Sequence, residues 1–396
     1  MKILIIASRI PKIYKSKGDQ IRAYRRLAKF IEKGWEVKVI YYELPFQKRD
    51  HQKEGILQHE NLTYLPIKLN LLQLLNSFFK NLKKLPIQVA IFKSKKGENI
   101  LKKTIQNFSP DITLSIVSRS CADLCSLKIP YCLDLIDSLS LNMLRRSEKS
   151  NWLSKKFFKL ESDKLFSFEK KLVQNSELCW ITSDIDREYL KETKIKLSPV
   201  AIDIFKYKIE SKKNPYKIIF SGNLNYAPNI DALNWLLDNC WDQVLLENKN
   251  AILHVVGRGA NQTLIKKIHS HKSTLFCGEV NDMNEYIKDA AISIAPMQSG
   301  SGMQLKILEA MRLGIPVITN QLGRGDIRAK NNEEILLADK PQDFAKKICC
   351  LLSNKNLRES LGLKGKLFVE KQHNAKLNSM NFYDDIMGLI KTNYFE

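Results

Sequence analysis

The stretch APMQSGSGMQLKILEAMRLGIPVITN, residues 295–320, decides the fold of this chain. Its opening residues are typical of the end of a buried strand, and the small residues at 299–302 predict a loop. A helix is expected over about 303–313, ended by Gly314, with Pro316 opening the next strand. The expected apolar side of this helix carries Leu305, Leu308 and Met311. The stretch therefore predicts a strand–loop–helix–strand unit of an α/β domain.

The loop and helix at 299–313 suit a diphosphate. Glycine residues let the backbone approach a ligand closely, and free N–H groups at a helix start attract anions. Lys306 and Glu309 are three residues apart and share one helix face. Lys306 is placed to meet a phosphate oxygen, and Glu309, roughly 10 Å along the axis from the loop, a ribose. Taken alone the pair would be an ordinary surface ion pair; within the whole stretch, a ligand site is favoured.

The rest of the chain repeats the same alternation of strands and helices. Apolar runs at 3–7 and 37–42 enclose a helical pattern that Gly34 ends, and the motif restarts at 216–221. Further strands are expected at 112–117, 131–136, 178–182, 253–257, 274–278, 292–295 and 317–320. We therefore predict an α/β protein with two Rossmann-like, doubly wound domains facing a cleft. The expected boundaries are 1–205 for the first domain, 206–375 for the second domain, and 376–396 for a helix that packs back on the first domain.

Charge is spread unevenly along the chain. The net charge is +22; residues 1–200 hold 38 Lys and Arg against 21 Asp and Glu (+17), and the remainder 26 against 21 (+5). A basic half indicates an anionic partner such as a membrane surface, whereas a coding bias towards Lys explains it equally well. No basic motif with interleaved aromatic residues is present, so no nucleic-acid partner is expected.

The compartment follows from two observations. No apolar run is long enough for a membrane span, and the eight cysteines form no CxxC pair or Cys/His ligand cluster. A cytoplasmic protein is the expectation, either free or bound peripherally to the inner face of the plasma membrane. Two segments mix Lys with Phe and Leu: 74–85 and 152–172. Packing against the core is favoured for the second, and core packing and a membrane surface are equally favoured for the first.

Four segments together resemble family 4 glycosyltransferases, which have the GT-B fold. They are FSGNLNYAPNIDALNWLL, LHVVGRG, LFCGEVNDMNEYIKDAAISIAP and the stretch at 295–320. The resemblance covers about 216–320 well and the first half faintly. It implies transfer of a sugar from a nucleoside-diphosphate donor, bound by the second domain, to a glycan or lipid-linked acceptor, bound on the side of the first domain, in cell-surface polysaccharide synthesis. It further implies retention, no essential metal ion and no cofactor beyond the nucleotide sugar.

The resemblance also suggests site residues. It assigns Glu309 to the donor ribose and the loop at Gly300, Ser301, Gly302 and Met303 to the diphosphate and sugar. The family's second glutamate, eight residues before the first, is replaced here by Ser301. Its loop cations are also absent: Gly222, Asn223 and Leu224 stand for Gly-Arg-Leu, and Pro228-Asn229 stands where a lysine falls. Lys306 and Arg258 are the candidates to replace them.

The first half offers fewer candidates. Gly18 and Asp19 stand in place of the family's glycine-rich acceptor loop; Asp19 either orients an acceptor hydroxyl or caps the helix from Gln20, and capping is favoured. Arg119, after the strand at 112–117, contacts substrate or is solvated. Of Asp134 and Asp137, we favour Asp137 for the site because it lies at a strand's end. Lys306, Arg119 and Asp137 are thus the candidate catalytic residues.

Two other functions remain open. A nucleotide-sugar epimerase of the same fold would need acid and base residues in the cleft, and no convincing pair is visible. A catalytically inactive subunit that binds nucleotide or membrane would explain both the basic half and the missing glutamate.

Overall fold

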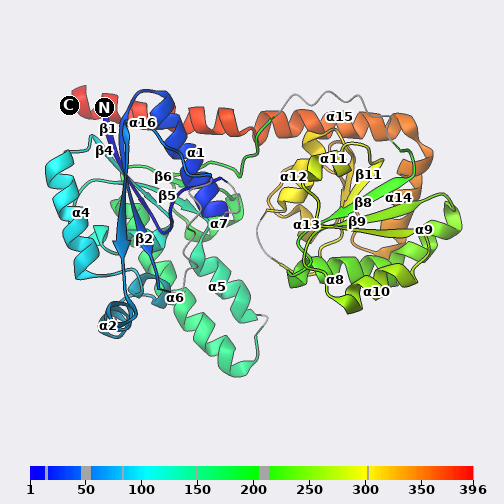
Figure 1. The fold of residues 1–396 in the computed structure, drawn as a ribbon, viewed down its shortest axis with the longest axis horizontal. Coiled ribbons are helices and arrows are strands. Elements are labelled where there is room, and N and C mark those ends of the chain that lie inside the picture. The colour runs from blue at the N-terminus through cyan, green and yellow to red at the C-terminus, as the bar shows by residue number, and fades with distance from the viewer. Residues whose placement is uncertain are drawn as a thin grey trace. The chain divides into compact units, whose positions relative to one another are not determined.

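The computed structural model describes residues 1–13, 17–45, 55–82, 84–148, 150–204, 214–300 and 303–395. These form two compact units, each with its own core (Figure 1). The first unit comprises Met1–Pro199 and Leu377–Glu396, and the second Val200–Lys376. The sequence had placed these two boundaries at 205/206 and 375/376.

The first unit is built on a seven-stranded parallel sheet of order β3-β2-β1-β4-β5-β6-β7. Its strands are β1 (Lys2–Ala7), β2 (Glu36–Glu43), β3 (Leu62–Lys68), β4 (Ile112–Ile116), β5 (Cys132–Ile136), β6 (Cys179–Ile181) and β7 (Ile195–Leu197). The predicted strands at β1, β2, β4, β5 and β6 are confirmed, whereas β3 and β7 were not predicted. Helices α1 (Gly18–Glu32), α2 (Leu71–Asn81), α3 (Ile87–Ala90), α4 (Lys95–Phe108), α5 (Leu139–Glu148), α6 (Trp152–Asn175) and α7 (Asp184–Leu190) surround it.

A buried charge cluster fastens α1 to the sheet. Asp134 on β5 is fully buried and accepts hydrogen bonds from Arg22 Nε at 2.8 Å and Arg26 Nε at 3.2 Å. Burial lowers the pKa of Arg26 to about 9, with Arg22 adding to the shift and Asp134 opposing it. Two guanidinium groups thus satisfy one buried carboxylate, as burial of a charge requires. Asp134 is structural, which leaves Asp137 as the aspartate at the strand's end.

The last helix, α16 (Ala375–Phe395), packs on the first unit. Phe382 is 2% exposed and its ring centroid lies 4.3 Å from that of Trp180. Trp180 Nε1 donates to Asp385 at 2.8 Å, and Lys196 pairs with the same carboxylate. The Arg26 guanidinium lies 3.8 Å from the Phe382 centroid. The helix therefore completes the core of the first unit.

Two helical segments of the first unit have no buried side chains. No residue of α2 is buried; Leu72 is 77% and Phe79 69% exposed. At the start of α6, Trp152 is 78% and Leu153 72% exposed. The prediction that residues 152–172 pack against the core is wrong for the first nine residues of α6. Burial along α6 begins at Glu161, whose carboxylate accepts the backbone N–H groups that open α3.

The second unit repeats the architecture with six parallel strands in the order β10-β9-β8-β11-β12-β13. They are β8 (Lys217–Ser221), β9 (Ile252–Val256), β10 (Thr274–Gly278), β11 (Ile292–Ala295), β12 (Val317–Thr319) and β13 (Leu336–Leu337). All but β13 were predicted. The helices are α8 (Ala227–Leu236), α9 (Asp242–Glu247), α10 (Gln262–Ser270), α11 (Met283–Ile287), α12 (Leu305–Arg312), α13 (Gln321–Arg324), α14 (Pro341–Ser353) and α15 (Lys355–Gln372). Among the described helices, none is both long and apolar enough to cross a membrane.

Phe382→Ala tests how much α16 contributes to the first unit. Removing a fully buried aromatic ring should lower the free energy of unfolding of that unit by about 3–5 kcal/mol. Urea titration followed by the fluorescence of Trp180 and the other tryptophans measures the change. Lys391→Ala, on the exposed side of the same helix, should leave the midpoint unchanged. Equal midpoints for Phe382→Ala and the parent would contradict a structural role for α16.

Candidate functional site

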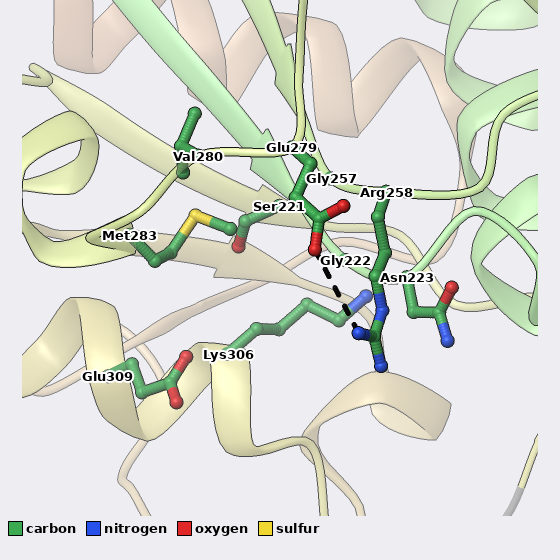
Figure 2. A pocket seen from close by; sticks show the side chains of 10 residues that line it. All are labelled: Ser221, Gly222, Asn223, Gly257, Arg258, Glu279, Val280, Met283, Lys306 and Glu309. Atoms are coloured by element: carbon green, nitrogen blue, oxygen red, sulfur yellow. Dashed lines mark ion pairs between the residues drawn. The ribbon is translucent and has the colours of Figure 1, made fainter. Parts of the chain in front are cut away.

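An open pocket of about 280 Å³ lies at the carboxyl ends of the strands of the second unit (Figure 2). Its floor comes from the ends of β8 and β9, one wall from the segment after β10, and the other from α12. The lining residues are Ser221, Gly222, Asn223, Gly257, Arg258, Glu279, Val280, Met283, Lys306 and Glu309. Ligands of parallel α/β sheets bind at this edge.

Two glycines form the floor, because the backbones of β8 and β9 approach too closely there for side chains. A Cβ at Gly257 would lie 1.8 Å from the Gly222 carbonyl oxygen, and one at Gly222 would lie 2.8 Å from the Asn229 amide nitrogen. Gly222 N donates to Val256 O, and Gly257 N donates to Gly278 O. The floor is thus bare backbone, which lets a ligand lie close to it.

Lys306 extends from α12 across this floor. Its Nζ donates to Asn229 Oδ1 at 2.5 Å and lies 3.7 Å from Met297 Sδ. The same nitrogen lies 5.1 Å from the centroid of the Phe220 ring, a distance at which a cation is attracted to the ring face. Asn229 in turn donates to Asn223 O at 2.9 Å. One amide therefore links the lysine to the loop after β8.

Burial changes the acid–base properties of both charged residues on α12. It lowers the pKa of Lys306 to about 8, and the nearby Glu309 carboxylate opposes this shift only in part. Burial also raises the pKa of Glu309, against the pull of Arg312 and Lys306. The ammonium ion lacks full solvation in the pocket. An incoming anion would supply the missing interaction.

Arg258 supplies a second cation at the rim. Its Nη1 lies 3.9 Å from Glu279 Oε1, and both side chains are well exposed, at 62% and 70%. Figure 2 shows the Arg258 guanidinium and the Lys306 amino group extending towards one another, with Glu309 further along α12. An exposed ion pair of this kind is weak and easily replaced. The arrangement suits a ligand with two linked anionic groups and a hydroxyl-bearing end.

The pocket brings together five of the nine predicted donor-site residues. Lining it are Gly222, Asn223, Arg258, Lys306 and Glu309. Of the predicted loop, Gly300 has a φ of 109° beside Pro228, and neither it nor the half-buried Met303 lines the pocket. Ser301 and Gly302 lie outside the described residues.

The prediction for α12 needs one correction. The helix begins at Leu305, two residues later than expected, and Leu305 is 42% exposed. Its buried side is formed by Ile307, Leu308, Ala310 and Met311.

Sequence reasoning missed several contributors. Asn229 was noted only as the residue standing where a lysine falls, and its contact with Lys306 spans 77 positions. Glu279, Val280 and Met283 follow β10 and were quoted within a longer segment without being singled out. Their position after a parallel strand was the available signal.

A second polar cluster lies at the carboxyl ends of β1, β4 and β5 in the first unit. Asp19 accepts hydrogen bonds from Arg9 Nη1 at 2.8 and 3.1 Å and from Ser8 Oγ at 3.2 Å. Arg119 Nη2 lies 3.8 Å from the same carboxylate. Asp137 Oδ2 accepts from Asn142 at 2.7 Å, and burial raises the Asp137 pKa against Arg119. Three of the predicted residues thus converge, and Arg9 was not predicted.

Asp19 does not cap α1, contrary to the favoured prediction. The helix begins at Gly18 with Lys17 as its N-cap, and the Asp19 carboxylate turns to Arg9 instead. Charge attraction to a guanidinium ten residues earlier outweighs the local capping preference. Of the two alternatives for Arg119, a solvated side chain is disfavoured, because the side chain is only 20% exposed and burial lowers its pKa.

Two strand ends beside this cluster are strained. Val117 and Ile136 both have a φ of 70°, a region that β-branched residues rarely enter. Asp137 N donates to Leu135 O, which closes a three-residue turn around Ile136. Strain of this kind costs on the order of 1–3 kcal/mol per residue and gathers at functional sites.

The second unit matches a known family. Residues 215–354 match the model described as "Glycosyl transferases group 1". A curated relative, an uncharacterized 44.6 kDa protein in the cps region of Klebsiella pneumoniae, is 26% identical over 238 residues, which are 57% of this chain. The match spans 60% of that relative's length.

Solved structures resemble the whole chain. Sucrose-phosphate synthase from Thermosynechococcus elongatus is 16% identical with a TM-score of 0.65, over 99% of both chains. Anabaena HepE in complex with UDP is 12% identical with a TM-score of 0.64, over 98% of this chain and 100% of that one. At these identities the likeness shows the fold alone, and that fold is GT-B.

Lys306 should titrate far below an ordinary lysine. We expect a midpoint near pH 8, because the buried ammonium ion is charged below that pH and neutral above it. NMR of reductively ¹³C-methylated protein measures it, with Lys306→Arg identifying the resonance by its disappearance. Bound pyrophosphate should move the midpoint upward, since an anion stabilises the charged form. A midpoint near 10.5 in the empty protein would mean that the amine is solvated.

Proposed function

We propose that this chain, whose residues 215–354 match the model of the group 1 glycosyl transferases, is a glycosyltransferase that uses a nucleoside-diphosphate sugar. The acceptor is a glycan or a lipid-linked glycan, and the product belongs to a cell-surface polysaccharide. The name of the relative from a cps region supports the last point. The proposal treats the nucleotide sugar as a co-substrate and includes no further cofactor.

One observation carries the donor assignment. Lys306 and Glu309 lie on one side of α12, against a floor of bare backbone at Gly222 and Gly257. A diphosphate on this floor would meet the Lys306 amino group, and the carboxylate of Glu309 would accept hydrogen bonds from the two ribose hydroxyls. The UDP in the structure of Anabaena HepE, a protein of the same fold, is consistent with such a ligand.

The reaction would depend on electrostatic stabilisation. Negative charge grows on the leaving diphosphate as the glycosidic bond breaks, and a fixed cation in a poorly solvated pocket stabilises it more strongly than water does. Lys306 would supply that charge, with Arg258 at the rim. Attack on the same face of the sugar, with the leaving phosphate taking the acceptor proton, gives retention. Retention and independence of a metal ion are both taken from the family resemblance.

Turnover of a donor panel tests the function. UDP-, GDP- and ADP-sugars should be screened for thermal stabilisation, and the stabilising donor then assayed for nucleoside-diphosphate release. Release should continue in excess EDTA. Loss of activity restored by magnesium would contradict metal independence, conversion of the donor into its epimer would favour an epimerase, and binding without turnover would favour an inactive subunit.

Lys306→Met and Glu309→Ala should affect different steps. Lys306→Met keeps the apolar stem, so its affinity for the nucleotide sugar should fall less than its turnover, which should be about 100-fold or more slower. Glu309→Ala should weaken UDP binding by about 1.5–3 kcal/mol, the value of a hydrogen bond to a charged group. Calorimetry and steady-state kinetics separate the two. If Lys306→Met turned over like the parent, the charge on the leaving diphosphate would have to be stabilised by Arg258 or by a cation of the first unit.

We also propose that the first unit binds an anionic membrane surface. Residues 71–82 and the first nine residues of α6 expose Leu, Phe and Trp side chains among lysines, and neither segment contains an acidic residue. Lys164 Nζ donates to Leu82 O, so α6 runs beside the end of α2. A helix without buried residues gains little from packing, so a covering surface would stabilise it. Peripheral attachment would bring the enzyme to a lipid-linked acceptor.

Liposome flotation tests the membrane proposal. The protein should float with vesicles that contain phosphatidylglycerol at low salt, and less as salt rises, because screening weakens attraction to the surface. The double variant Trp152→Ser/Phe157→Ser should float less. Leu246→Ser, which removes an 81% exposed leucine from the second unit, is the matched control. Equal flotation with neutral vesicles, or no flotation with either kind, would mean that coding bias explains the basic charge of the first half.

A further inference from the structure

We propose that Arg9 and Arg119, at the carboxyl ends of β1 and β4, bind an anionic group of the acceptor, either a phosphate or a carboxylate. The inference rests on the proposed glycosyltransferase function and adds the chemical class of the acceptor. It arises from the charges, the unsatisfied donors and the backbone strain of this edge of the first unit.

The charges of the cluster do not balance. Arg9 and Arg119 both face the single carboxylate of Asp19, at 2.8 and 3.8 Å. Asp137 is the other acid nearby, and its carboxylate accepts a hydrogen bond from Asn142 instead of from either arginine. Both guanidinium ions therefore depend on the single carboxylate of Asp19 for a direct ion pair. A poorly solvated site with such an excess favours an anionic ligand.

Donors also outnumber acceptors. A guanidinium carries five N–H groups in a planar fork, so two of them present ten. Within the described residues, Arg119 Nε is buried without a hydrogen-bond partner, and the contact of Arg119 Nη2 with Asp19 is too long for a hydrogen bond. Arg9 donates to Asp19 through Nη1 alone. Both arginine side chains remain 20–24% exposed, so the free edges of the forks can be reached.

The backbone holds these groups in place at a cost. Val117, two residues before Arg119, and Ile136, directly before Asp137, are the strained strand ends. Strain in β-branched residues persists where the surrounding structure requires one conformation, and such places are enriched at ligand sites. These two residues fix the direction in which the backbone leaves β4 and β5, and so the positions of Arg119 and Asp137.

The geometry points to phosphate or carboxylate rather than to a neutral hydroxyl. A planar guanidinium binds two oxygens of one anion through parallel N–H groups, and a pair of forks surrounds the anion from two sides. A neutral sugar hydroxyl would leave most of the donors unused. The competing explanation is a structural triad in which Asp19 holds both arginines together, and this explanation predicts the opposite effect of removing the Asp19 charge.

Calorimetric titration of the full-length protein, saturated with UDP so that the pocket in the second unit is filled, tests the proposal. The probes are glucose 1-phosphate, glucuronate and, as the neutral reference, glucose. Both anions, or one of them, should bind more tightly than glucose. Arg9→Gln and Arg119→Gln should each weaken the anion by about 10- to 100-fold, the range for a lost hydrogen bond to a charged group. Arg146→Gln, an exposed arginine of the same unit, should not.

Asp19→Asn is the decisive variant. It removes the carboxylate that competes with the ligand, so the anion should bind more tightly than in the parent. Weaker anion binding in Asp19→Asn, equal binding of glucose and glucose 1-phosphate, or parental affinity in both arginine variants would each overturn the proposal. UDP affinity is measured first in every variant. Loss of UDP binding in the parent would contradict the proposed function, whereas intact UDP binding with unchanged anion binding would contradict this inference alone.

Discussion

The position of one ammonium group governs the pocket of the second unit. Lys306 Nζ reaches from α12 to Asn229 at the start of α8, and Asn229 joins it to the carbonyl group of Asn223. A half-buried cation needs such partners, because burial without them is costly. The contact fixes the distance between α12 and the loop after β8, and so the width of the space above Gly222 and Gly257. Met297 and Phe220 complete the surroundings of the cation with polarisable groups.

The sequence was sufficient for the fold because buried parallel strands are continuous apolar runs bounded by turn residues. The strands it missed, β3, β7 and β13, lie at sheet edges; β7 and β13 have only three and two residues, and β3 includes Pro66. The site was predicted where its residues lie close in sequence, as at Lys306 and Glu309. It was missed where the contacting residues are far apart in sequence, as at Asn229. The role favoured for Asp19 was wrong, because a capping preference contains no information about Arg9.

Both units have unusual backbone at the carboxyl ends of some of their strands, and they differ in the residues that adopt it. In the second unit β9 is followed by Gly257, and β10 ends at Gly278 with a φ of 71°, a conformation that glycine adopts without strain. In the first unit the corresponding conformation falls on Val117 and Ile136. Glycine leaves room for a ligand against the backbone, whereas the β-branched residues keep a filled core beneath the edge. The second unit therefore offers a backbone floor, and the first unit a row of side chains.

The two cations that line the pocket of the second unit, Arg258 and Lys306, differ in burial and are therefore suited to different tasks. Arg258 is exposed, so water and salt screen its charge, and its interaction with any anion is weak. Lys306 is desolvated, so its charge acts through a lower dielectric and gains strength as charge develops nearby. The same desolvation lowers its pKa to about 8, and an anionic ligand beside the amino group would raise that pKa again. A half-buried lysine can thus stabilise an anion strongly, but its charge is sensitive to pH.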